Sequence, residues 1–185
     1  MKRFIALFSA LIVATGVMTA QDAPKKYEIK SGTFTTVSEV MGHVIESTTY
    51  FDDYGRLETS KVNTFGMVIS TISRDGKVYM VNHSAKQVQE MPVQESVNYL
   101  DLTDEIIAKY KITEAGTETV SEKDCVKYNM EVAQTGQTAK LTVSVWNGIP
   151  MKTITSTNGM DVTTTVTSVV ECDVDPALFI IPTFE

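Results

Sequence analysis

The chain has 185 residues and a formal net charge of −7. A chain with this charge does not attract nucleic acid or an anionic membrane surface, because its electrostatic field has the wrong sign. Its length suits one domain with a sizeable core. We therefore expect a single folded domain and no nucleic-acid partner.

The first twenty residues, MKRFIALFSALIVATGVMTA, have the layout of a secretory signal peptide. Lys2 and Arg3 give a basic start, an apolar core follows, and Ala20 ends the segment with a small residue. The apolar run is short for a membrane span. We predict a cleaved signal peptide over 1–20, which would move the net charge to −9. An uncleaved N-terminal anchor is the alternative.

After a flexible lead-in at 21–26, the chain follows the patterns of short β-strands. Runs of four to eight residues alternate apolar and polar side chains or are rich in β-branched residues. The expected strands of this half are 27–30, 33–40, 44–51, 56–63, 67–73, 78–82 and 87–91. Asp75-Gly76 favours a tight hairpin between two of them.

The apolar period changes once, near residue 103. Ile106, Ile107 and Tyr110 recur at helical spacing, Thr103 is a good N-cap, and acidic residues follow it. Lys109 near the end suits the helix dipole. We predict one short helix over 103–110.

The strand pattern then resumes and continues to the C-terminus. We expect a turn at 114–118, strands at 118–120 and 124–133, and a three-strand meander after Leu141. Its two turns are Asn147-Gly148 and Asn158-Gly159, because Asn-Gly pairs accept positive φ at both turn positions. The fold class is therefore mainly β. We predict a strongly curved antiparallel sheet of about ten or eleven strands, with a short helix inserted in its middle.

Cys125 and Cys172 are the only cysteines of the chain. In an oxidising compartment two thiols tend to pair. The loop between them would hold about 48 residues, and a bond closing it would stabilise the fold by roughly 4 kcal/mol. We predict a disulfide between Cys125 and Cys172. Two buried free thiols are the alternative.

Catalytic and metal-binding motifs are missing from the sequence. His43 and His83 are forty residues apart, and neither the C-x-x-C spacing nor a calcium loop is present. Ser84 follows His83, but no G-x-S-x-G motif surrounds it. Asp52-Asp53 are explained as turn formers. We expect no enzymatic activity, no metal and no cofactor.

The C-terminal third resembles the LolA/LolB-like superfamily of periplasmic lipoprotein-localisation factors and related outer-membrane lipoprotein-sorting proteins. Trp146 precedes the run Gly148-Ile149-Pro150-Met151-Lys152, and Asn158-Gly159 opens the next turn. A penultimate strand covers 163–169, and the tail at 174–182 matches the family's D-P-x-x-F-x-x-P ending. The resemblance covers about forty residues. The N-terminal helix of the family's carriers has no counterpart, since strands begin almost at once.

The resemblance implies a single LolA-like β domain over 27–185. In this fold an unclosed half-barrel has a short helix lying over its concave face, and acyl chains bind between sheet and helix. Seven methionines follow residue 20, and their flexible side chains suit such a cavity, although ordinary core packing also explains each of them. The predicted cavity residues are Met67, Tyr79, Val81, Ile106, Ile107, Tyr110, Met130, Met151 and Phe179.

These observations predict a non-enzymatic protein exported to the periplasm or cell envelope of a Gram-negative bacterium. It would bind an apolar ligand, such as a lipid or the acyl chain of a lipoprotein, in the concave cavity. No further apolar stretch reaches membrane-spanning length, so it would not be an integral membrane protein after cleavage. The alternative is a structural or protein-interaction module that uses the same fold to meet an envelope protein partner.

Overall fold

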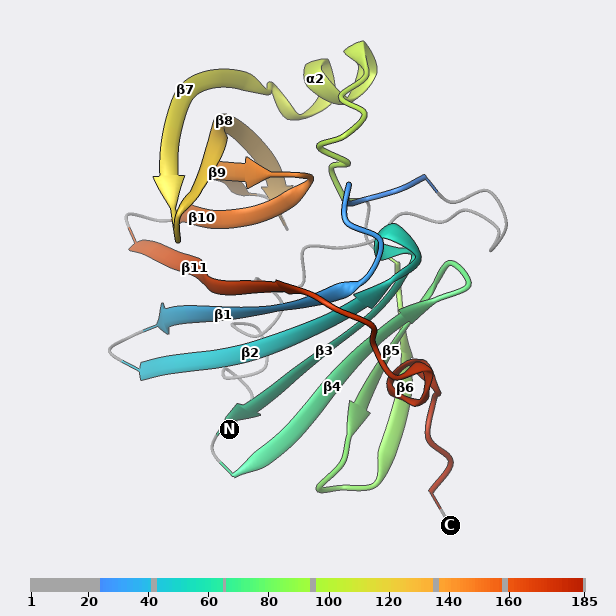
Figure 1. Cartoon of the computed structure of the whole chain (residues 1–185). Helices are drawn as coiled ribbons and strands as arrows, with labels where there is room; N and C mark the ends of the chain where they lie inside the picture. The colour runs from blue at the N-terminus through green and yellow to red at the C-terminus, as the bar shows by residue number, and fades with distance from the viewer. Residues whose placement is uncertain are drawn as a thin grey trace.

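The computed structural model describes residues 24–40, 43–64, 66–93, 96–134, 137–157 and 160–184, and it forms one antiparallel sheet of eleven strands. Figure 1 shows the sheet with helix α2 (Asp104–Tyr110) at one end. The strands are β1 (Gly32–Val40), β2 (His43–Asp52), β3 (Leu57–Thr64), β4 (Met67–Arg74), β5 (Lys77–Asn82), β6 (Gln87–Met91), β7 (Thr113–Val120), β8 (Lys123–Gln134), β9 (Gln137–Trp146), β10 (Ile149–Thr157) and β11 (Met160–Glu171). The predicted mainly β class is confirmed.

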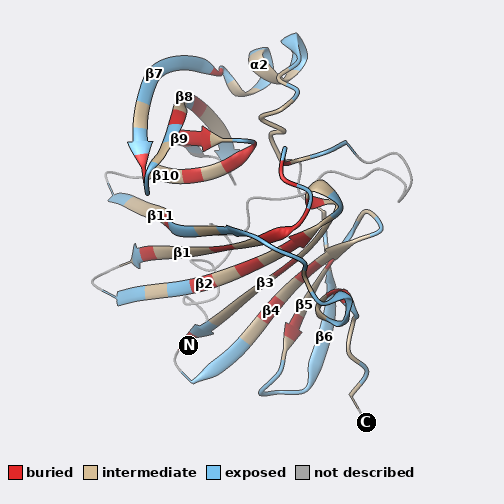
Figure 2. Ribbon diagram, viewed as in Figure 1, coloured by how far each residue is buried: buried red, intermediate tan, exposed pale blue. Residues whose placement is uncertain are grey.

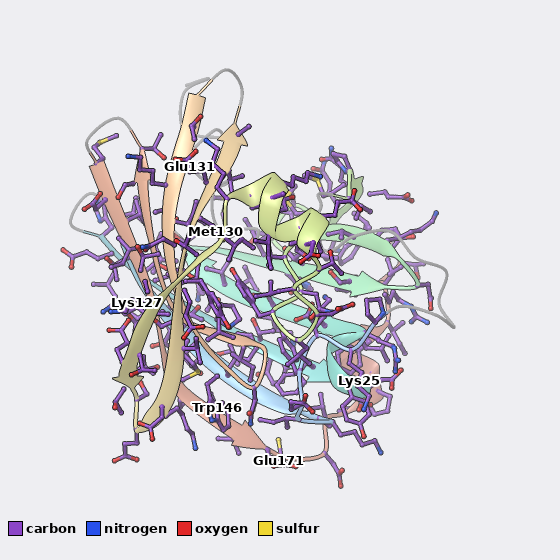
Figure 3. All side chains as sticks on the ribbon, turned by 90° about the horizontal axis from the view of Figure 1, so that it is seen from above. Lys25, Lys127, Met130, Glu131, Trp146 and Glu171 are labelled. Atoms are coloured by element: carbon purple, nitrogen blue, oxygen red, sulfur yellow. The ribbon has the colours of Figure 1, made fainter. Side chains whose placement is uncertain are left out.

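The spatial order of the strands is β6-β5-β4-β3-β2-β1-β11-β10-β9-β8-β7. Two antiparallel meanders, β1–β6 and β7–β11, are therefore joined where the first strand pairs with the last. Strands β6 and β7 lie at opposite edges and do not pair with each other, so the sheet is open. Seen from above, α2 lies in the angle between the two meanders (Figure 3).

Tight turns join most of the strands, as their sequences predict. Asn147 and Gly148 have φ angles of 50° and 81°, and the Asp75-Gly76 pair has 52° and 71°. Positive φ at both central residues matches the twist of a two-residue hairpin. The Asn158-Gly159 turn lies outside the described residues, but Thr157 pairs with Met160 on either side of it.

The segment before β1 is not the strand that its alternation predicts. Tyr27 and Ile29 are buried in the core, and the backbone of this segment is hydrogen-bonded to other parts of the chain. The N–H of Tyr27 donates to the carbonyl of Tyr54, and the N–H of Glu28 donates to that of Asn147. This segment, residues 24–31, crosses the ends of several strands, and we refer to it as the strap. Its alternation reflects burial by tertiary contacts and not strand pairing.

Residues 114–118 are also not the predicted turn. They belong to β7, which pairs with β8, and its register shifts between Glu114 and Thr117. Gly116 has a φ of 88° at this irregularity. A glycine within a strand often marks such a bulge. Gly116 therefore marks a bulge within β7 and not the chain reversal that its sequence predicts.

Helix α2 begins and ends where its sequence predicts. The Thr103 side chain accepts a hydrogen bond from the Ile106 N–H at 3.3 Å, which satisfies one free donor of the first turn. Asp104 and Glu105 follow in the first turn, and Lys111 ends the helix in the left-handed conformation. None of the helical residues is fully buried, so α2 rests on the sheet surface.

The main core joins the two meanders. It contains Phe34 and Phe51 of β1 and β2, together with Ile149, Met151 and Val166 from the other half of the sheet. Tyr27 of the strap packs edge-on against Phe51, with ring centroids 4.9 Å apart. Figure 2 shows that burial is concentrated in the middle of the sheet, whereas β6 and much of α2 are exposed.

The predicted disulfide is absent from the structure, where both thiols are free. Cys125 of β8 is fully buried in the main core, whereas Cys172 is exposed just after β11. Strands β9 and β10 lie between β8 and β11 in the sheet. The prediction required the two cysteines to be neighbours across adjacent strands, and they are not.

Within the described ranges, no helix is long and apolar enough to cross a membrane. The predicted signal peptide, residues 1–20, lies outside these ranges.

Gly148 offers a direct test of how the strap closes the fold. A Cβ atom at this position would lie 2.0 Å from the Lys26 carbonyl oxygen, and the backbone φ is +81°. We expect Gly148→Ala to lower the free energy of unfolding by about 3 kcal/mol, combining backbone strain with the clash. Urea unfolding followed by circular dichroism measures this change.

Gly116 is the matched control, because its φ is +88° but nothing lies within 4 Å of an added Cβ. Gly116→Ala should cost only the backbone strain, about 1 kcal/mol. Equal losses for the two variants would contradict the packing of the strap against the β9–β10 turn.

Candidate functional site

Strand register divides the side chains of the sheet between two faces, because successive residues point to opposite sides. We refer to the face that carries Phe34, Thr36 and Ser38 of β1 as the inner face. Met130 and Val143 share this face and contact α2, which shows that the helix covers it. In Figure 3, Met130 lies on the side of β8 toward α2 and Lys127 on the opposite side. We refer to that opposite side as the outer face.

Small hydroxyl side chains dominate the middle of the inner face. Adjacent strands place them opposite one another in rows that cross the sheet. We define the hydroxyl patch as Thr36, Ser38, Ser47, Thr49, Ser60, Thr71, Thr153 and Thr164. Because these side chains are short, they extend only a small distance from the backbone of a curved sheet.

The hydroxyl groups of the patch are largely paired with one another. The Oγ of Ser38 lies 2.7 Å from Oγ1 of Thr164, and Oγ1 of Thr36 lies 3.0 Å from Oγ of Ser47. Thr49 donates to Ser60 at 3.2 Å. A hydroxyl with a partner can lose water at little cost, whereas an unpaired one cannot. The patch is therefore tolerant of contact with an apolar molecule.

Charged side chains of β1–β4 lie almost entirely on the outer face. Glu39, Glu46, Lys61 and Arg74 all alternate with inner-face residues. The exception is Glu58, at the end of the inner face, where Lys26 and Tyr27 of the strap both bond its carboxylate. The middle of the inner face thus carries hydroxyl and aliphatic groups without charge.

The strap closes one end of the inner face. Tyr27 packs on Phe34 and Phe51, and its hydroxyl donates to Glu58. Burial, with the neighbouring Glu58 carboxylate, raises the pKa of Tyr27 well above its ordinary value. The tyrosine therefore stays neutral, and the closed end of the face is aromatic.

Helix α2 and the segment before it cover a second apolar region, which we refer to as the helix cluster. Tyr99 stacks on Tyr128 with ring centroids 5.9 Å apart, and its hydroxyl lies 3.5 Å from the sulfur of Met130. Burial also raises the pKa of Tyr99. The helix cluster comprises Val97, Tyr99, Leu102, Ile106, Ile107, Tyr110, Ile112, Tyr128, Met130, Leu141, Val143 and Val145.

The nine predicted cavity residues separate into three groups. Ile106, Ile107, Tyr110 and Met130 come together in the helix cluster. Met151 belongs to the main core, and Met67 lies on the inner face at the start of β4, 39% exposed. These six are all on or beside the inner face, but they do not form one cluster.

Tyr79, Val81 and Phe179 are not on the inner face. Register places Tyr79 and Val81 on the outer face of β5, beside Ile72 and Ser70. The C-terminal tail covers this region, with Thr59 donating to the carbonyl of Leu178 and Arg74 to that of Phe179. The prediction that they line the concave cavity is wrong, because the D-P-x-x-F segment packs behind the sheet.

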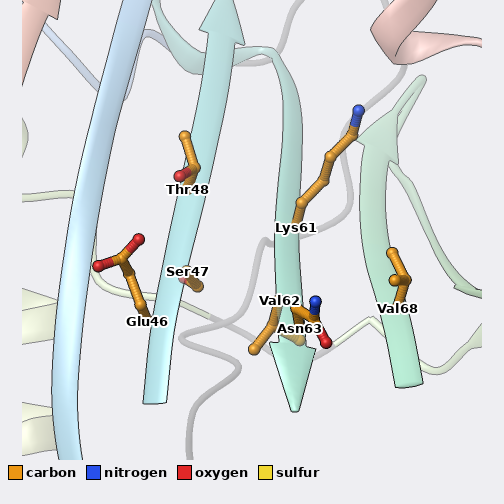
Figure 4. Close-up of a pocket in the computed structure, with 7 residues that line it drawn as sticks. All are labelled: Glu46, Ser47, Thr48, Lys61, Val62, Asn63 and Val68. Carbon is orange, nitrogen blue, oxygen red and sulfur yellow. The ribbon is translucent and has the colours of Figure 1, made fainter. Parts of the chain in front are cut away.

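Two surface pockets lie outside the helix cluster. One, of about 250 Å³, is on the outer side of β2–β4 and includes Glu46, Lys61 and Asn63 (Figure 4). The other, of about 310 Å³, lies at the end of β11 and includes Lys30 and Cys172. Residues of α2 line neither pocket, since the helix side chains pack directly on β8 and β9. In the described part of the chain, no group of three His, Cys, Asp or Glu side chains is placed to hold a metal ion.

The hydroxyl patch is the feature that our sequence interpretation missed. Its members recur at every second residue of the strands, as in Phe34-Thr35-Thr36-Val37-Ser38. That spacing assigns them to one face, but threonine and serine also populate exposed strands. Only the pairing of β1 with β11 shows that residues 126 positions apart, Ser38 and Thr164, meet.

No protein-family model and no curated protein matches the sequence. Among solved structures, the chain is similar to an uncharacterised conserved protein from Thermus thermophilus, with a TM-score of 0.60 and 13% identity over 85% of this chain and 89% of that one. It is also similar to a chain of the Pseudomonas aeruginosa MucA/MucB complex, with a TM-score of 0.59 and 13% identity over 85% of this chain. It spans only 57% of that chain.

MucB solved alone gives a TM-score of 0.56 with 14% identity, over 85% of this chain and 59% of MucB. Likenesses at such identity show a shared fold and no more. These neighbours have LolA/LolB-like folds, so the fold that the C-terminal motifs implied is confirmed.

The Ser38–Thr164 pair tests whether the inner face depends on paired hydroxyls. Ser38 is 1% exposed, so Ser38→Ala leaves Thr164 without its partner. We expect a loss of about 1–2 kcal/mol for Ser38→Ala and for Thr164→Val. The double variant should lose clearly less than the sum, because neither hydroxyl is then orphaned. Urea unfolding of the four proteins gives the coupling.

Thr165→Val, on the outer face, is the control. Thr165 sits beside Thr164 on β11 but pairs opposite Val37, and we expect a change within about 0.5 kcal/mol. Additive losses at Ser38 and Thr164 would refute the paired-hydroxyl interpretation.

Proposed function

We propose that this chain, which has the LolA/LolB-like fold, is a non-enzymatic cell-envelope protein that binds an acyl chain along the inner face of its sheet. The ligand would be a lipid or the acyl chain of a lipoprotein. It would lie across the hydroxyl patch, between the strap and the helix cluster.

The observation that carries this proposal is the distribution of charge between the two faces. Except for Glu58, the charged side chains of β1–β4 point outward, whereas the middle of the inner face presents hydroxyl groups that are mostly bonded to one another. An acyl chain carries no charge and needs no hydrogen bonds. Each buried methylene contributes about 0.8 kcal/mol to binding. A face of this kind can therefore cover a hydrocarbon chain without leaving a polar group unsatisfied.

The two ends of the inner face support the same ligand. The strap end is aromatic, with Tyr27, Phe34 and Phe51 in mutual contact. The other end contains Met130 under α2, a flexible side chain suited to varied apolar partners. Helix α2 has no fully buried residue, so displacing it would cost less than opening the main core.

The cellular setting of the proposal rests on the sequence. The predicted signal peptide would bring the chain to the periplasm or cell envelope, where lipids and lipoproteins pass between membranes. MucB, which shares the fold, has been solved in complex with the periplasmic part of MucA, so this fold also meets protein partners. For the present chain we favour the apolar ligand, because the middle of the inner face is uncharged.

Lipid binding is tested by purifying the protein from its envelope and recording native mass spectra before and after solvent extraction. We expect a bound lipid in the wild type. Val62 lies in the middle of the inner face, opposite Ser47 and Ile69. A lysine there would have to be buried against hydrocarbon, so Val62→Lys should reduce the bound fraction at least about tenfold.

Val68→Lys is the matched control, because Val68 is 39% exposed on the outer face of the neighbouring strand β4, opposite Asn63. This variant should retain the lipid. A clean apo mass for the wild type, with no uptake of added lipids, would refute the proposal and favour an interaction module. Equal loss in both lysine variants would show that the lipid does not occupy the inner face.

A further inference from the structure

An open sheet has two edges, and each edge presents backbone N–H and C=O groups that can pair with another strand. Soluble proteins usually protect such edges with bulges, charges or covering segments. Here the edges are β7 and β6. They differ sharply in how they are protected.

The β7 edge is well protected. Its register with β8 is broken between Glu114 and Thr117, and Gly116 adopts a φ of 88° within the break. The carboxylate of Glu118 bonds the Ser144 hydroxyl of β9 and lies 3.2 Å from the Lys152 ammonium of β10. Strand β7 is therefore bulged and acidic, and the Glu118 side chain is bonded to two further strands. Such a strand is a poor template for pairing with a partner strand.

The β6 edge has no bulge, and its only charged side chain is Glu90. Gln87 to Met91 pair with β5 in an uninterrupted register, and no positive φ occurs within the strand. Its first four residues are exposed, and Val88 leaves 38% of its surface in solvent. Such a strand offers its outer backbone groups and Val88 to the strand of a partner.

We propose that β6 pairs antiparallel with β6 of a second copy of this chain, about a two-fold axis at Val88. In this register Val88 lies opposite the partner's Val88, and Gln87 lies opposite the partner's Gln89. Lys86, the turn residue directly before β6 with a φ of 53°, lies beside the partner's Glu90. The symmetry repeats the Gln87–Gln89 and Lys86–Glu90 pairs, whereas the Val88 pair lies on the axis and occurs once.

The register is selected by charge and by the alternation of faces. Shifting the axis by one residue places Val88 opposite the partner's Glu90 or the partner's Lys86, so an apolar group faces a charge. Only the axis at Val88 brings Lys86 and Glu90 together twice. It also extends an apolar row, since Val88 pairs with the fully buried Val81 of β5 within each copy.

The two copies would form one continuous sheet with both inner faces on the same side, because residues directly opposite in an antiparallel pair share a face. The second copy therefore covers neither inner face. Pairing through β6 is therefore compatible with ligand binding and independent of it.

Sedimentation equilibrium of the purified protein over a range of concentrations measures the association. We expect a monomer–dimer equilibrium in the wild type. Lys86→Glu and Glu90→Lys each create two like-charge pairs, and each should weaken the dimer about tenfold or more. The double variant Lys86→Glu/Glu90→Lys restores the opposite charges and should recover most of the affinity.

Glu90 also pairs with Lys77 of its own chain at 3.3 Å, so thermal unfolding of each variant verifies that the fold is intact. A cross-link gives an independent readout. In a Cys172→Ser background, Val88→Cys should form a dimer under mild oxidation, linked through the thiol introduced into each copy. Thr117→Cys on the β7 edge should not.

A wild type that stays monomeric at all concentrations would overturn the proposal. A dimer whose affinity is unchanged by both charge reversals would place the interface elsewhere and overturn the proposal. Cross-linking of Thr117→Cys as readily as Val88→Cys would do the same.

Discussion

The pairing of β1 with β11 is the constraint on which the rest of the structure depends. It joins the first strand of the chain to the last, aligning Gly32 with Glu171 and Glu39 with Thr163. Every other strand pair links neighbours along the chain through a turn or a short segment. Without this contact the two meanders would each lack half of the main core, which takes Phe34 from one and Ile149 from the other. Such a non-local contact is also costly in chain entropy, so it should form late in folding.

The same pairing creates the uncharged middle of the inner face. Each strand is unremarkable alone, because alternating polar and apolar residues are common in half-exposed sheets. Once β1 lies between β2 and β11, the hydroxyls of Thr36 and Ser38 meet Ser47 and Thr164. The hydroxyls of the inner face then need few hydrogen bonds from water, whereas the charged side chains lie mainly on the outer face. Binding of a hydrocarbon chain follows from this division more directly than from any single residue.

Local features of the fold were predictable from the sequence, and long-range ones were not. Asn147-Gly148, the Thr103 cap and the alternation of β2–β6 act within a few residues, so pattern rules place them well. The strap looked like a strand because Tyr27 and Ile29 alternate, although tertiary burial causes that alternation. Cys125 and Cys172 looked like partners until the sheet order placed two strands between them. Phe179 looked like a cavity residue, but the motif that contains it packs on the outer face.

Photo-cross-linking with a diazirine-bearing fatty acid tests the central claim most directly, because it reports which face the hydrocarbon touches. The labelled residues are identified by peptide mass spectrometry after illumination of the intact protein. The account predicts labels on inner-face residues such as Val62, Ile69 and Met80, competed away by unlabelled fatty acid. Labels confined to outer-face positions such as Lys61 and Val68, or spread evenly over both faces, would contradict it.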